Sequence, residues 1–168
     1  GPMPLRWVGK THVSQARRRG NSALEPVSIA AGAIKPGVPN RDLKVSPQHR
    51  ILLDGYGCDL LFAEPVMLAS AKSLINGDTI RSCGEEFETL DYWHLMFEDH
   101  EVVFANGCPT ESLYLGDVLE DSLSTQQLEE LRALFPNNSL VQKTLAFPQL
   151  KPHEVATLMA LPAQELQD

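Results

Sequence analysis

The sequence predicts a mostly β fold, with a β-rich body over residues 1–118 and a small helical appendix over residues 119–168 packed on the same domain. Apolar and polar residues alternate at 43–46, as in a strand that buries one face. Residues 89–105 are dense in aromatic and β-branched residues, which favours sheet over helix. The tail differs, because apolar residues follow at helical spacing after residue 124.

In the front half, a strand-like stretch begins at Pro4 and runs to about Val13, and residues 14–24, which are polar, basic and rich in turn residues, predict a loop. A short apolar stretch and several turn residues lead to a strand over 43–46. Pro47 interrupts this strand, which resumes at 50–53 before a turn.

Residues 67–74 predict a short helix that ends at Asn76-Gly77, because both residues tolerate the left-handed conformation that stops a helix. Residues 89–105 predict two strands joined by a tight turn at 98–100. Alternation places Tyr92, His94 and Met96 on one face of the first of these strands.

The tail predicts two helices. Ser124 and Gln127 form the pattern of a capping box, and apolar residues follow at helical spacing as far as Phe135. A second helix is expected to start near Pro152, with an apolar face made of Val155, Leu158 and Met159.

Charge and composition exclude several classes of partner. The net charge of −8 combines +7 over residues 1–50 with −15 over residues 51–168. Such an acidic chain is a poor ligand for nucleic acid, and the basic run at 17–19 is short enough to be a solvated loop or to be attracted to the acidic remainder. No apolar run approaches the roughly 18 residues of a membrane span. Three cysteines without a C-x-x-C pair predict reduced, mostly structural thiols.

Three segments, taken in order, resemble the processing motifs of the Hint (hedgehog/intein) domain superfamily, and of bacterial Hint-domain proteins in particular. Residues 43–52 resemble the Thr/Ser-x-x-His segment, residues 71–80 the Leu-x-x-Gly-Asp turn, and residues 92–107 the final strand pair that ends in Asn-Gly. Residues 4–9 and 151–154 fit the bacterial subgroup that is often attached to secreted repeat proteins. The resemblance covers nearly the whole chain.

The resemblance implies a horseshoe-like β-rich fold and single-turnover self-cleavage. An N-terminal Cys or Ser attacks the carbonyl before it, which converts the peptide into a thioester or ester. Ser46 and His49 would polarise and protonate the amide nitrogen, and His100 would support them. Because positions 46 and 49 lie on opposite faces of a strand, a bend at Pro47 is required. No metal and no organic cofactor is implied.

The resemblance also places the nucleophile in a segment before Pro4, so the N-terminal strands are expected to be missing and the chain to be inactive alone. The junction would comprise Asn106, Gly107, Cys108 and Ser112. By position, Glu111 stands where splicing members have a penultimate His, and Ser112 where they have a terminal Asn. Splicing is therefore not expected, whereas a hedgehog-like N-terminal cleavage through a thioester remains open.

The expected partner is the chain's own N-terminal segment or a separate N-terminal fragment. Unpaired strand edges would also permit self-association. No nucleic acid or membrane partner is expected. The alternative is a degenerate Hint scaffold that serves as a non-catalytic binding or assembly module. A zinc hydrolase built on His49, His94 and His100 is a third hypothesis, for which the expected ligand spacing is absent.

Overall fold

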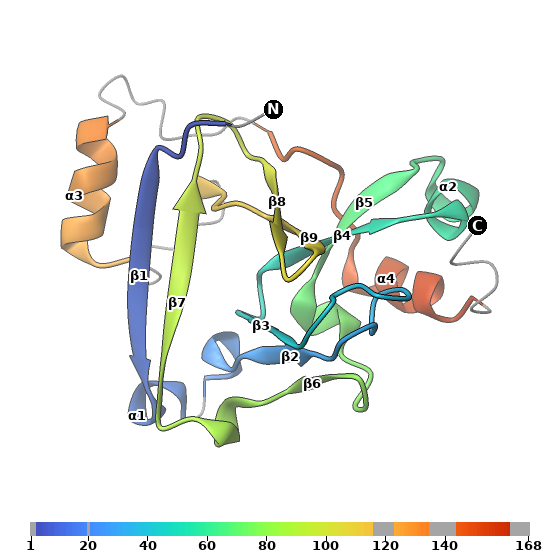
Figure 1. Ribbon diagram of the computed structural model, residues 1–168, viewed down its shortest axis with the longest axis horizontal. Helices are drawn as coiled ribbons and strands as arrows, with labels where there is room; N and C mark the ends of the chain where they lie inside the picture. The colour runs from blue at the N-terminus through green and yellow to red at the C-terminus, as the bar shows by residue number, and fades with distance from the viewer. Residues whose placement is uncertain (1–2, 20, 116–122, 135–143, 162–168) are drawn as a thin grey trace.

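The computed structural model describes residues 3–19, 21–115, 123–134 and 144–161 (Figure 1). These residues contain three antiparallel sheets with nine strands in all, so the mostly β prediction is confirmed. The strands are β1 (Trp7–Ser14), β2 (Val27–Ile29), β3 (Leu43–Val45), β4 (Arg50–Asp54), β5 (Val66–Ser70), β6 (Ile80–Ser82), β7 (Thr89–Met96), β8 (Val102–Ala105) and β9 (Cys108–Glu111). The helices are α1 (Gln15–Arg18), α2 (Tyr56–Phe62), α3 (Thr125–Leu134) and α4 (Pro152–Met159), with short 3-10 helices η1 (Ser22–Leu24), η2 (Ala71–Leu74) and η3 (Gly84–Glu86).

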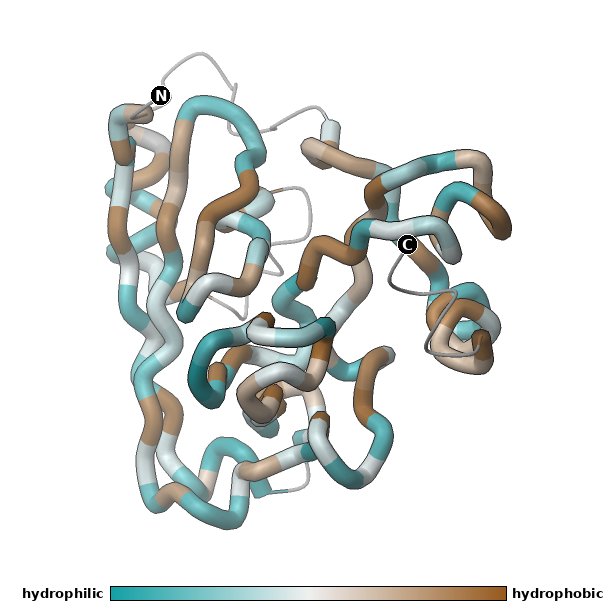
Figure 2. The backbone as a smooth tube through the Cα atoms, turned by 45° about the vertical axis from the view of Figure 1, so that its right-hand side comes forward, coloured by the Kyte–Doolittle hydropathy of each residue, from teal (hydrophilic) through white to brown (hydrophobic). Residues whose placement is uncertain are grey.

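A long two-stranded ribbon, β1 with β7, forms one side of the molecule (Figure 1). Its register runs from Trp7 opposite Met96 to Ser14 opposite Thr89. Figure 2 shows both hydrophobic and hydrophilic residues along this ribbon. Burial alternates from residue to residue over most of both strands, as half-buried strands require. Trp7 and Met96 are buried with Leu123 and Leu131, so α3 packs against the ribbon, beside β1 (Figure 1).

The larger core lies between the sheet β5-β4-β9-β8 and the sheet β3-β2-β6. It includes Ile29, Ile51 and Cys108 from the strands, together with Val155 and Leu158 from α4. The two tail helices therefore pack on different cores of the β body. The expected boundary at residue 118 lies outside the described residues.

The predicted helix over 67–74 is wrong. Residues 66–70 form β5, which pairs with β4 along its whole length, and only residues 71–74 form a 3-10 turn. A short buried apolar run has no helical period to distinguish it from a strand, and pairing with β4 decides the outcome. The helix α2, which directly follows Gly55, was not predicted.

The predicted loop over 14–24 is wrong in part, since it contains α1 and η1. The Ser14 hydroxyl accepts a hydrogen bond from the Arg17 amide and caps α1. Arg18 is buried rather than solvated, and its guanidinium donates to the carbonyls of Gly84 and Phe87.

The two strands within 89–105 exist but do not pair with each other, because β7 pairs with β1 and β8 with β9. The pairing partner of a strand depends on the whole topology, which local alternation does not report. Within the described part of the chain, no helix has the length and apolar character needed to cross a membrane.

Candidate functional site

The chain turns sharply between β3 and β4, at the residues that resemble the Thr/Ser-x-x-His segment. The His49 amide donates to the Ser46 carbonyl at 3.1 Å, so residues 46–49 form a β-turn with Pro47 at its second position. The fixed φ of proline suits that position. The required bend is therefore present, and it brings Ser46 and His49 to one corner of the molecule.

The corner is fastened to the segment that resembles the Leu-x-x-Gly-Asp turn. The Ala71 amide donates to the His49 carbonyl at 2.8 Å, and the Lys72 amide donates to the Pro47 carbonyl at 2.9 Å. Further along this segment, Asn76 Oδ1 accepts the amides of Asp78 and Ile80 and closes the loop. Two of the three segments singled out in the sequence thus meet at the His49 turn.

In the third segment, Asn106-Gly107 forms the two-residue turn between β8 and β9. Both residues have positive φ, +52° and +74°, as the favoured hairpin turn requires. Asn106 Oδ1 accepts from Arg41 Nε at 2.9 Å, and its Nδ2 donates to the Asp42 carbonyl at 3.0 Å. Asn106 and Gly107 therefore lie at the distant end of the hairpin from Glu111, where they anchor the loop before β3.

β9 leads from this turn back toward the His49 corner. Ile51 pairs with Thr110 in antiparallel register. Extending this register by one and by two residues places Arg50 opposite Glu111, and His49 opposite Ser112. The predicted junction position Ser112 is thereby brought near Ser46 and His49, whereas the turn at Asn106 is not.

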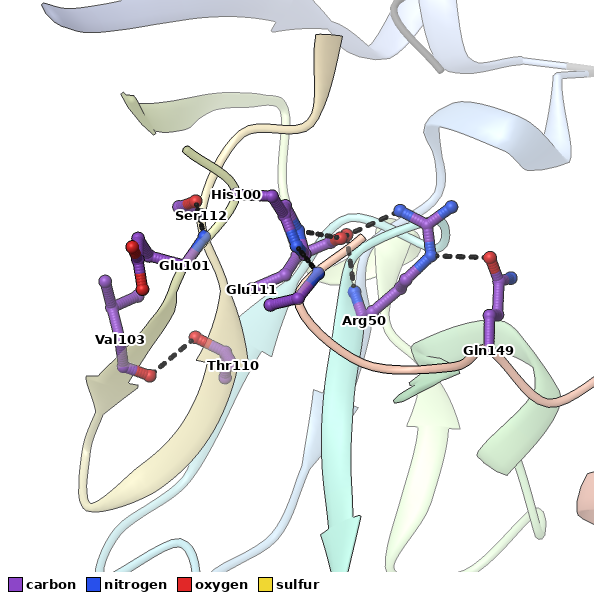
Figure 3. Close-up of polar contacts among 9 residues, drawn as sticks. Arg50, His100, Glu101, Val103, Thr110, Glu111, Ser112 and Gln149 are labelled. Atoms are coloured by element: carbon purple, nitrogen blue, oxygen red, sulfur yellow. Dashed lines mark hydrogen bonds and ion pairs between the residues drawn. The ribbon is translucent and has the colours of Figure 1, made fainter. Parts of the chain in front are cut away.

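Glu111 is the centre of a buried network of charged groups (Figure 3). Its Oε1 accepts the backbone amide of Arg50 at 2.8 Å, and its Oε2 accepts the Arg50 guanidinium at 2.8 Å. The same Oε2 lies 3.1 Å from Nε2 of His100. All three residues are buried. Both carboxylate oxygens are thus held, and charge-assisted bonds of this kind are the strong ones.

His100 is a buried side chain and not an exposed turn residue. The Ala146 amide donates to its Nδ1 at 2.9 Å, so this nitrogen acts as an acceptor. The arrangement fits the tautomer that carries the proton on Nε2 and donates it to Glu111. The Tyr114 ring packs edge-on against the imidazole with centroids 5.3 Å apart.

Residues 144–150, which precede α4, cross this network. Arg50 Nε donates to Gln149 Oε1 at 2.8 Å, beside the bond from Ala146 to His100. The Leu68 amide donates to the Pro148 carbonyl at 2.8 Å, and the Leu150 amide donates to the Leu68 carbonyl at 2.8 Å. The tail therefore binds along β5 and closes one side of the site.

Charge and burial act in opposite directions on the groups gathered here. Burial by itself raises the pKa of Glu111, but the hydrogen bond from His100 and the charges of His49 and Arg50 outweigh it and lower that pKa. The pKa of His49 is lowered, first by burial and then by Arg50 and His100, while Glu111 opposes the change.

His94 joins this group from the ribbon. Its pKa is lowered by burial and by the nearby His49. Its Nε2 lies 3.1 Å from the Thr11 hydroxyl of β1. The histidines at 49, 94 and 100, which the sequence leaves scattered, therefore face one region. The described residues nevertheless contain no group of three His, Cys, Asp or Glu side chains arranged to hold a metal ion, so the zinc hypothesis gains no support.

The remaining predicted junction residues are engaged in the fold. The Ser112 hydroxyl is buried and accepts the Glu101 amide at 2.9 Å, while the Ser112 amide donates to the Glu101 carbonyl at 2.8 Å. Cys108 is fully buried, and burial raises the pKa of its thiol to about 11. Burial also raises the pKa values of Cys58 and Cys83, so none of the three cysteines of the sequence presents an accessible thiolate.

The parts of the network that are not histidine, namely Arg50, Tyr114 and Gln149, were not predicted, and Glu111 was noted only by its position. One signal was available. Arg50 is the first residue of the strand β4, and Glu111 is the last residue of β9, so each charge adjoins a buried element and needs a partner. Their pairing across 61 residues is set by the fold.

No curated protein matches the chain, and no solved structure matches it. The family profile described as the Hint domain matches residues 1–117. The match contains the His49 turn, the segment fastened to it and the β8–β9 hairpin. Since it spans well over half of the 168 residues, the chain belongs to the Hint domain family, the hedgehog/intein class of autoprocessing domains.

Proposed function

We propose that this chain supplies the assisting residues of a self-cleaving Hint domain, with Ser46 and His49 acting on the scissile peptide. The observation that carries the proposal is the turn that brings Ser46 and His49 together beside the buried Glu111 network. A hydroxyl and an imidazole of tuned proton affinity are the groups needed to weaken an amide bond. His100 supports them through Glu111.

The reaction proposed is an N–S or N–O acyl shift. The nucleophile's sulfur or oxygen attacks the preceding carbonyl carbon, a new C–S or C–O bond forms, and the C–N bond breaks. The proton lost by the nucleophile is delivered to the departing amine through His49, while Ser46 donates a hydrogen bond at the scissile group. Water or an added thiol then cleaves the thioester or ester and regenerates the nucleophile.

The nucleophile is proposed to lie on a segment N-terminal to these residues, either joined to the chain or supplied as a separate fragment. The support for this is the state of the cysteines, all three of which are buried with raised pKa values. A thiol must be accessible and ionisable to attack a carbonyl. The chain alone is therefore proposed to be inactive, and the added segment would be its partner.

The test joins an N-terminal Hint segment that carries the nucleophilic Cys and a reporter to this chain, in cis or as a separate fragment. Release of the reporter is followed by intact mass with and without added thiol. Thiol-stimulated release is expected, and His49→Ala should slow it by about 100-fold or more, as loss of a general acid does. The matched control is His153→Ala, which removes an exposed histidine of α4.

A second candidate is the non-catalytic binding module. Large apolar side chains that remain exposed support it, above all Phe104 at 75% and Trp93 at 64% exposure. Trp93 lies on the outer face of the β1–β7 ribbon, opposite Lys10. An assembly that folds correctly but releases no reporter would favour this module over the self-cleaving domain.

A further inference from the structure

We infer that Glu111 is a positioning residue for His49. From the end of β9, the Glu111 carboxylate holds a fixed negative charge beside this histidine. The inference rests on the proposed role of His49 as the group that carries the proton. It adds a residue to the site that acts through another side chain and does not itself touch the scissile peptide.

The carboxylate of Glu111 is fastened to the backbone at His49. Its Oε1 accepts the amide of Arg50, the residue that follows His49, at 2.8 Å. Its Oε2 is held at 2.8 Å by the Arg50 guanidinium and at 3.1 Å by His100. With both oxygens bound and the side chain buried, the charge has one position relative to the turn.

Stability alone does not explain this charge. A buried ion pair contributes little over a well-packed apolar pair, because desolvation offsets most of the attraction. Glu111 and Arg50 lie on the neighbouring strands β9 and β4, which also contribute Cys108 and Ile51 to the apolar core. A carboxylate retained at this position is better accounted for by its effect on the adjacent histidine.

Three charged groups on three parts of the chain act on His49: Glu111 on β9, Arg50 on β4 and His100 in the β7–β8 connection. His94 on β7 also faces His49, which lowers the pKa of His94. Burial and the charges of Arg50 and His100 disfavour the imidazolium form of His49. Glu111 acts in the opposite sense, so it allows this half-buried imidazole to take up a proton and release it again.

The tail supports Glu111 from the other side. The Ala146 amide occupies Nδ1 of His100, which directs the Nε2 proton to Glu111. Gln149 accepts from Arg50 Nε and leaves the Arg50 terminal nitrogen for Glu111. Residues 146–149 thereby belong to the same positioning network, although they lie outside the matched family region.

The experiment is a titration of the histidine side chains by NMR on this chain as it stands, without any added segment. We expect the pKa of His49 to fall in Glu111→Gln, because the negative charge that opposes the lowering is lost. In Glu111→Asp, which keeps the charge on a shorter side chain, the pKa of His49 should lie between the wild-type value and the Glu111→Gln value. The control variant is Glu98→Gln, which removes an exposed carboxylate paired with Arg6 and should leave His49 unchanged.

Because Glu111→Gln leaves Arg50 buried without its partner, the double variant Arg50→Met/Glu111→Gln is titrated as well. It removes both charges, and the pKa of His49 should still lie below that of wild type, since Glu111 has the larger effect of the two. Equal His49 pKa values in wild type and in the folded variants would overturn the inference.

The same variants separate this inference from the proposed function. If His49 responds to Glu111 but the restored assembly releases no reporter, self-cleavage fails and the positioning charge stands. If the assembly cleaves and needs His49, Glu111→Gln should slow cleavage about tenfold, a fraction of a full general-acid contribution, and shift its pH profile toward lower pH. Cleavage with an unchanged rate and pH profile would overturn the inference alone.

Discussion

Among the described residues two arginines are buried, Arg18 at 1% and Arg50 at 8% exposure, and their surroundings differ. Arg18 donates to the carbonyls of Gly84 and Phe87, which are neutral, and lies 3.6 Å from the partly exposed Glu25. Arg50 donates to the buried carboxylate of Glu111 and to Gln149. Arg18 therefore connects α1 to the residues around η3, whereas Arg50 pairs with a buried negative charge.

This difference distinguishes a charged side chain with a structural role, Arg18, from one that lies beside groups able to exchange protons, Arg50. Backbone carbonyls keep the same charge at every working pH, so the two groups that accept hydrogen bonds from Arg18 do not respond to protons. Arg50 shares Glu111 with His100 and lies beside His49, a histidine whose pKa depends on these charges. Coupled titratable groups of this kind concentrate at functional sites.

The largest effect that this comparison predicts is the loss of stability in Arg50→Met. The substitution leaves Glu111 buried without its cationic partner, which should lower the free energy of unfolding by about 3–5 kcal/mol. Urea unfolding at pH 7 measures it. The double variant Arg50→Met/Glu111→Gln should recover much of the loss, because no unpaired charge remains. Equal stability of the single and double variants would show that the pair is not coupled.

Arg18→Met should lower the free energy of unfolding by less than Arg50→Met does. A second substitution, at Glu25, should not restore the lost stability. The carbonyls of Gly84 and Phe87 lose their donors, and leaving buried acceptors unsatisfied reduces stability by about 1–3 kcal/mol. Glu25→Gln is the paired variant. Since Glu25 is partly exposed and its contact with Arg18 is long, this change should cost less than about 1 kcal/mol. A strong coupling between the two variants in a double-mutant cycle would erase the distinction drawn here.

Much of the fold could be predicted because its signals are local. The alternation in β7, the Asn106-Gly107 turn and the capping box at Ser124 each lie within a few residues of sequence. The capping box is observed as two reciprocal hydrogen bonds. The Gln127 amide donates to the Ser124 hydroxyl, and the Ser124 amide donates to the Gln127 side chain. Such features form wherever the residues occur in the right order.

The charged network could not be predicted in this way. Glu111 lies 61 residues from Arg50 and 11 from His100, and Ala146 lies 46 residues from His100. Hydrophobic periodicity says nothing about which buried charges meet. The family resemblance directed attention to His49 and Ser46, but the residues that hold His49 in its electrostatic surroundings became visible only with the sheet order β5-β4-β9-β8.

The smallest predicted effect is the change in stability per unit of pH. It distinguishes the surroundings of Arg18 from those of Arg50 most clearly. The pKa values of His49 and His94 are lowered in the folded protein, so below about pH 6.5, the ordinary histidine value, the unfolded chain binds more protons. Stability should therefore fall as pH drops from 7 toward 5, by at most about 1.4 kcal/mol per pH unit for each histidine. The contribution of Glu111, whose pKa is also lowered, is lost only at more acidic pH.

Urea unfolding at a series of pH values tests this directly. His49→Asn should flatten the profile between pH 7 and 5, because one of the two histidines no longer titrates. Arg18→Met should shift the whole curve downward and keep the wild-type slope, since Arg18 is not among the groups that lower the pKa values of His49 and His94. If Arg18→Met changed the slope as much as His49→Asn does, the surroundings of Arg18 would be coupled to protons too, and the separation of a structural arginine from one beside a titrating site would not hold.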